Sequence, residues 1–180
     1  MKAVAWLLSL SAACAPHAHK PEQPPLAPPE NGILGADVEL PQRRTTGPLT
    51  PAERDSLIRT VAAHRAAWHA RHISAYRIRL AIGCFCPWPG NPAILEVRDG
   101  VAVELRDTTG QSIGKPREPW SLYTVDGLFD AVEQSAQRAD VVEVGFDPTY
   151  DYPALIRGDG KVGLPDDWFW VRASRLTLLR

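Results

Sequence analysis

The sequence predicts an α+β domain in which an antiparallel sheet of about six strands carries two helices on one face. Two segments repeat apolar residues at helical spacing, and the segments that follow each of them alternate apolar and polar residues with a period of two. The expected order is helix, three strands, helix, three strands. This order could reflect two copies of one αβββ unit, although no repeat is visible residue by residue.

The first helix is expected to begin after Thr50. Thr50 can cap it, Pro51 suits its first position, and Glu53 completes a capping box. One stripe at helical spacing follows, formed by Leu57, Val61, His64, Trp68 and His72. We therefore expect this helix to run to about His72.

Residues 74–83 alternate strictly, which predicts a strand with one buried face and with Arg77 and Arg79 on the other face. Residues 93–97 and 101–105 form the next two strands. A three-residue loop, 98–100, would place Val97 and Val101 on the same sheet face, so we expect a bulged turn with Gly100 left-handed.

The second half repeats this plan. A loop rich in Gly and Pro covers residues 108–120, and a helix over 125–138 follows with Thr124 or Asp126 as its cap. Strands are then expected over 142–146, 154–157 and 168–178, with a turn over 147–153. Together these elements place a single α+β domain over residues 50–180.

The first thirteen residues have the pattern of a signal peptide, with Lys2 ahead of a short uncharged run. Ser11-Ala12-Ala13-Cys14 resembles the lipobox of bacterial lipoproteins, although Ser11 stands where Leu is usual. The resemblance implies cleavage before Cys14 and attachment there of diacylglycerol and an N-acyl chain such as palmitate. The alternative is ordinary signal cleavage that leaves Cys14 as a free thiol.

Residues 14–49 are expected to be a lipidated cysteine followed by an extended tether, because this segment is rich in proline and its apolar residues follow no period. Several acyl chains would hold the protein stably on a membrane. Ala15 is not Asp, which by resemblance to the lipoprotein sorting rule favours the outer membrane, facing the periplasm or the surface.

Composition narrows the classes of function. The net charge is −1, which gives no reason to expect nucleic acid as a partner. A 44% hydrophobic fraction suffices for a packed core. The Gly-x-Ser-x-Gly and His-Glu-x-x-His motifs are absent, so we predict no catalytic residues and no cofactor, and we favour a binding or structural domain over an enzyme.

Several motifs recur in an order that resembles the bacterial lipoprotein family called domain of unknown function 6174. They are Trp68, Tyr76-Arg77, Cys84-Phe85-Cys86-Pro87, residues 97–101, residues 123–129, Phe146-Asp147-Pro148 and Tyr152-Pro153. The resemblance covers about residues 60–179. One departure is Asp151, where the family usually has Gly. The family brings no known activity, and it supports the lipoprotein interpretation.

Cys84 and Cys86 are the most suggestive chemical element. The compartment reached by export is oxidising, which favours a disulfide, although an extended strand holds alternate Cα atoms at the limit for one. Three hypotheses remain open: a small structural bridge, two buried free thiols, or a thiol-active site for disulfide exchange or Cu(I).

Other candidate sites have simpler explanations. His69 and His72 could bind a metal, but histidines beside an apolar stripe are more often packed, and we predict no metal site. Asp147, Asp151, Asp159, Asp166 and Asp167 could bind calcium, but Asp beside Pro and Gly commonly forms turns. Trp168 and Trp170 share one strand face and could form a binding surface or pack in the core.

The sequence thus predicts a lipid-anchored protein of the bacterial cell envelope. Its expected partners are the membrane, through the anchor, and a protein or small molecule that the sequence does not identify.

Overall fold

The computed structural model describes residues 47–84, 92–114, 121–162, 164 and 167–180, which all belong to one compact unit. These described residues form two helices and seven strands, in the order α1 (Pro51–His69), β1 (Tyr76–Gly83), β2 (Ala93–Arg98), β3 (Val101–Arg106), β4 (Ser112–Gly114), α2 (Val125–Arg138), β5 (Val141–Phe146), β6 (Pro153–Asp159) and β7 (Trp168–Leu178). A short 3₁₀ turn, η1 (Ser121–Tyr123), precedes α2. The predicted α+β class is confirmed.

All the strands form one sheet in the order β4-β3-β2-β1-β7-β6-β5, and every neighbouring pair is antiparallel. Strands β1 to β4 and strands β5 to β7 are two meanders. They join where β1 pairs with β7, so the first strand of the sheet and the last strand of the chain meet at its centre.

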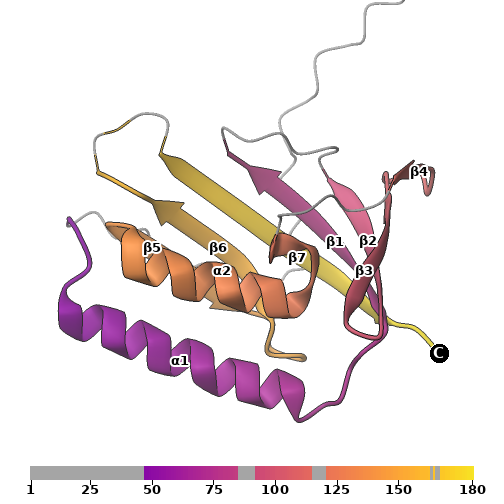
Figure 1. The fold of residues 1–180 in the computed structure, drawn as a ribbon, viewed down its shortest axis with the longest axis horizontal. Helices are drawn as coiled ribbons and strands as arrows, with labels where there is room; N and C mark the ends of the chain where they lie inside the picture. Colours follow the sequence, from indigo (N-terminus) through magenta and orange to yellow (C-terminus); the bar gives the residue numbers. More distant parts are fainter. Residues whose placement is uncertain (1–46, 85–91, 115–120, 163, 165–166) are drawn as a thin grey trace, which may run out of the picture. The chain divides into compact units, whose positions relative to one another are not determined.

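Both helices lie on the same face of the sheet, with α2 nearer to β5 and β6 and α1 alongside α2 (Figure 1). The helices run antiparallel, because Arg54 near the start of α1 donates to the Ala136 and Ala139 carbonyls at the end of α2. At the other end of the pair, His69 lies 2.6 Å from Asp126. Polar contacts therefore supply much of the α1–α2 interface.

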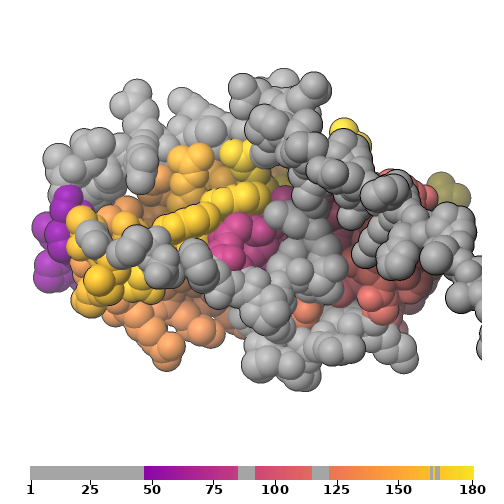
Figure 2. Space-filling model, turned by 90° about the horizontal axis from the view of Figure 1, so that it is seen from above, coloured from indigo at the N-terminus to yellow at the C-terminus, as the bar shows by residue number. Residues whose placement is uncertain are grey.

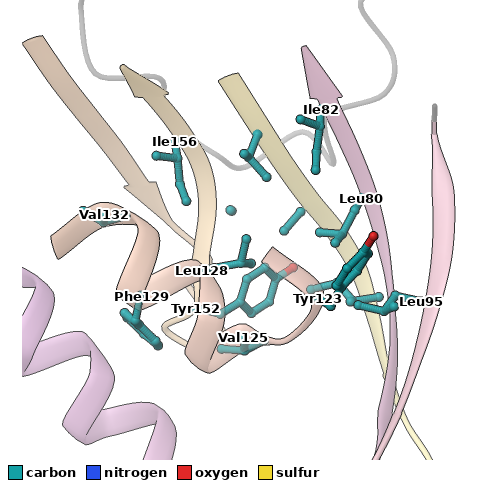
Figure 3. Close-up of a cluster of buried hydrophobic side chains, with 14 of the residues drawn as sticks. Leu80, Ile82, Leu95, Tyr123, Val125, Leu128, Phe129, Val132, Tyr152 and Ile156 are labelled. Carbon is teal, nitrogen blue, oxygen red and sulfur yellow. The ribbon is translucent and has the colours of Figure 1, made fainter. Parts of the chain in front are cut away.

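The core fills the space between the helices and the sheet. Leu128 of α2 lies beside Tyr152, while Tyr123 of η1 lies near Leu80 and Leu95 on the other half of the sheet (Figure 3). Trp68 connects α1 to this core through edge-to-face contacts with Tyr76 and Tyr152, at ring-centroid distances of 5.6 and 6.5 Å.

The helix boundaries agree closely with the sequence. The Thr50–Glu53 capping box is present, and Thr124 caps α2 by accepting from the Gly127 amide. Helix α1 ends at His69, however, and His72 has a φ of 52°. A residue in the left-handed region cannot continue a right-handed helix, so the expected extension to His72 is wrong.

The hairpin between β2 and β3 also differs from the expectation. Arg98 pairs with Val101, so the loop has two residues, Asp99 and Gly100, whose φ values of 51° and 74° fit a type I′ turn. The extra residue lies instead in β3, where the register shift leaves Val103 opposite no partner. Val101 is consequently 62% exposed and does not face the core with Val97.

The remaining differences are small. Strand β4 was not expected, because it has three residues inside a segment rich in Gly and Pro. Strand β6 begins one residue earlier and ends two residues later than predicted, and β7 has the predicted bounds. Part of the loop predicted over 108–120 lies outside the described residues.

Candidate functional site

The sheet face opposite the helices carries mainly charged and aromatic side chains. The cross-strand register assigns residues to it, because their neighbours along each strand face the core. We call it the helix-free face, and it consists of Arg77, Arg79, Ala81, Gly83, Ile94, Glu96, Arg98, Val141, Glu143, Leu155, Arg157, Asp159, Trp168, Trp170, Arg172 and Ser174. Its central strand, β7, lies between β1 and β5–β6 (Figure 2).

One end of this face is a hollow of about 570 Å³ beside Trp168 and Trp170. Val141 and Val162 add apolar lining, and Glu143, Arg157 and Asp159 add polar groups. Trp168 is 44% exposed, which is unusual for so large an apolar side chain. The hollow therefore combines an indole surface with charged groups at its edge, a common composition for a binding site.

Trp170 is held in place from two sides. Its indole lies directly over Gly83 on β1, where an added Cβ would come within 2.2 Å of the ring nitrogen. The Arg172 guanidinium lies 5.5 Å from the centre of the same ring. Gly83 is thus required by the close approach of the indole, and the ring position is fixed before any ligand binds.

Replacing Gly83 tests this packing. Gly83→Ala should force the indole to move and cost about 1–3 kcal/mol of unfolding free energy. In a Trp170→Ala background the same change should cost little, because the colliding ring is gone. A double-mutant cycle by urea unfolding measures the difference. Equal costs in both backgrounds would show that Trp170 does not lie over Gly83.

Ion pairs stabilise two buried carboxylates on the helix-free face. Glu96 accepts from Arg77 and from Arg98, at 2.9 and 2.7 Å, and these hydrogen bonds, led by that from Arg77, hold its pKa below the ordinary value. Glu143 lies 3.9 Å from Arg157 at the edge of the Trp168 hollow. Glu96 is therefore expected to remain charged at neutral pH.

Cys84 immediately follows β1 and packs partly buried against the core. Cys84 is not a free thiol in this structure. Cys86 lies outside the described residues, as does Cys14. The structure therefore describes one of the two predicted thiol residues, and it lies immediately after Gly83, the residue beneath the Trp170 indole.

Two histidines of α1 contact carboxylates that could not be predicted from the sequence. His64 stacks on Phe146 and lies 3.1 Å from Asp151, and Arg71 donates to the other oxygen of Asp151 at 2.8 Å. The described residues include no cluster of three groups suited to a metal ion, so these contacts are explained as hydrogen bonds within the fold. Asp147 accepts from the Thr149 and Tyr150 amides, which is a turn-forming role.

Asp151 has a φ of 66°, which explains why Gly would suit this position. The Arg71 hydrogen bond, assisted by His64, lowers its pKa. Its ionised form therefore stabilises the fold above the ordinary titration range of Asp, and this contribution is lost as pH falls through the lowered pKa.

Asp151→Asn should therefore lower the unfolding free energy by about 1 kcal/mol at neutral pH and by less at about pH 3, where Asp151 is partly protonated. Asn also tolerates the left-handed region, so the change should add no backbone strain. Urea unfolding at both pH values measures this. Asp99→Asn is the matched control, because Asp99 is also left-handed but exposed. An equal and pH-independent loss in the two variants would contradict the role of the Arg71 contact.

These features define a class: a small α+β domain with helices on one sheet face and a charged, aromatic face opposite. The chain belongs to the family of unknown function DUF6174, whose model matches residues 60–177. This match confirms the domain of unknown function that the sequence motifs predicted, whereas the lipoprotein part of that prediction stays a prediction. No curated protein and no solved structure matches the chain.

The family match extends from α1 into β7 and so includes the helix-free face. Within the part of the chain that the structure describes, neither helix has the length and hydrophobicity needed to cross a membrane.

Proposed function

We propose that this protein is a lipid-anchored domain of the bacterial cell envelope that binds a partner through its helix-free face and catalyses no reaction. Cys14 carries the lipid, residues 14–49 form the tether, and the α+β domain is displayed beyond it. The exposed Trp168 beside a ready-made hollow is the observation that carries the binding role.

The proposal of an anchor is supported by the first fourteen residues. Lys2, the uncharged run to Ala13 and the small residues before Cys14 match the pattern of a lipoprotein signal. Ala15 favours transfer to the outer membrane. Several acyl chains on one residue would give stable membrane attachment without a spanning helix.

The hollow is suited to a ligand with a flat apolar face and polar groups at its edge. The indoles of Trp168 and Trp170 would contact the apolar face, while Arg157 and Asp159 would hydrogen bond to the polar groups. The Trp170 indole is already held in place by Gly83 and Arg172, so little side-chain entropy would be lost on binding.

Site-specific photo-crosslinking in intact cells tests the binding role. A benzophenone amino acid at Trp168 should give a defined adduct, whereas the same group at the exposed Arg59 of α1 should not. Trp170→Ala should abolish the Trp168 adduct while leaving the thermal transition in place. Absence of any adduct, or equal adducts at both positions, would reject the Trp168 hollow as a binding surface.

We further propose that Cys84 and Cys86 form a structural disulfide that holds the end of β1. The observation that Cys84 is not a free thiol in this structure supports a bridge over thiol chemistry. Alkylation of the exported protein, followed by mass measurement, should find neither thiol reactive before reduction. Two reactive thiols or bound copper would instead favour the thiol-active alternative.

A further inference from the structure

A second hollow, of about 230 Å³, lies farther along the helix-free face between β1, β2 and β7. Its lining includes three arginines, Arg77, Arg79 and Arg175, and two threonines, Thr108 and Thr177. Among the residues that the structure describes, no acidic side chain lines it. We call it the arginine pocket. A concave site lined by cationic and hydroxyl groups is suited to an anion.

A β-bulge in β7 builds this pocket. Arg79 pairs with Ser174 and Arg77 pairs with Thr177, so β7 has one extra residue in this interval. Arg175 has a φ of 55°, a left-handed conformation that is strained for any residue other than Gly. The bulge lets Leu176 pack against the core while Arg175 lines the pocket.

The strain at Arg175 suggests that its side chain has a use. A glycine would adopt the same backbone without strain, as in other bulges of this kind. Residues held in unfavourable backbone regions are concentrated at functional sites. Arg175 therefore places a large cationic side chain at a position where the backbone conformation alone would favour Gly.

The charges of the pocket are only partly compensated. Arg77 forms an ion pair with Glu96, and Arg98 forms a second ion pair with the same carboxylate. Among the described residues, neither Arg79 nor Arg175 forms an ion pair, and the Nε of Arg79 is buried without a hydrogen-bond partner. A buried donor without a partner is costly, and a bound anion would satisfy it.

We propose that the arginine pocket binds a phosphate group, either free or as the headgroup of a lipid. Guanidinium groups donate paired hydrogen bonds that match phosphate oxygens, and the hydroxyl of Thr108 can add another. The proposal deepens the binding role of the helix-free face and rests on it. It does not depend on the Trp168 hollow, so the photo-crosslinking experiment and the one below can fail separately.

Isothermal titration calorimetry of the full chain with inorganic phosphate tests whether the arginine pocket binds phosphate. Arg175→Gly should weaken binding about tenfold or more while leaving the melting temperature unchanged or higher, because Gly suits the backbone. Arg59→Gln removes the same charge from the exposed surface of α1 and should leave affinity unchanged. Arg79→Lys keeps the charge but lacks the fork, and it should also weaken binding.

A second arm distinguishes the sources of phosphate. The unacylated Cys14→Ala chain is sedimented with vesicles of phosphatidylglycerol or of phosphatidylcholine, with and without Arg175→Gly. Selective, Arg175-dependent binding to phosphatidylglycerol without binding of inorganic phosphate identifies a lipid headgroup, and the converse identifies a free phosphate. No binding in either arm, or an equal loss in Arg175→Gly and Arg59→Gln, overturns the proposal.

Discussion

Trp68→Ala is expected to destabilise the domain by about 3–5 kcal/mol, the usual cost of removing a buried indole. Trp68 is 2% exposed and joins α1 to Tyr76 and Tyr152. Few other apolar side chains of α1 are buried, so much of the attachment of this helix depends on one ring. Urea unfolding followed by far-ultraviolet circular dichroism measures the loss.

Trp168→Ala provides the matched control, because it removes the same side chain from the helix-free face. Trp168 is largely outside the core, and its loss should change the unfolding free energy by no more than about 0.5 kcal/mol. If Trp168→Ala were as damaging as Trp68→Ala, Trp168 would be a core residue and its assignment to a binding surface would be wrong.

The second large effect is expected at the hairpin between β2 and β3. Val97 is fully buried and Val101 is exposed, although both lie within two residues of the same two-residue turn. Val97→Ala should cost about 2 kcal/mol, from lost burial and the cavity left behind, whereas Val101→Ala should cost less than about 0.5 kcal/mol.

Thermal or urea unfolding of the two variants measures this difference, with the same methyl groups removed in each. The result also tests the position of the bulge. Similar losses at Val97 and Val101 would mean that both face the core, as a three-residue loop would require, and would contradict the type I′ turn.

Local patterns were sufficient to predict most elements of the fold. Alternation placed Ile78 and Leu80 on the buried face of β1 and Arg77 and Arg79 opposite, because the side-chain period of a strand is fixed. The capping box at Thr50 located the start of α1. These features depend on neighbours within a few residues.

Long-range pairing and bulges could not be predicted in the same way. Nothing local indicates that β1 pairs with β7, or that the extra residue near the first hairpin lies at Val103 rather than in the turn. A bulge changes which side chains share a face without changing the composition of the strand. The burial of Val101 was therefore predicted wrongly.

Only the part of the candidate site that depends on local spacing could be predicted from the sequence. Trp168 and Trp170 lie two residues apart on one strand, so their shared face follows from the sequence. The arginine pocket depends on the bulge at Arg175 and on strands far apart in the chain. The contact of His64 with Asp151 joins residues 87 positions apart, which no local pattern reveals.

The most direct test of the account is the intact mass of the protein extracted from the envelope of a bacterium with two membranes. We predict a chain that begins at Cys14 and carries the added mass of diacylglycerol and an acyl chain, and that becomes unacylated in Cys14→Ala. A soluble product that retains Met1 and carries no lipid would contradict the account.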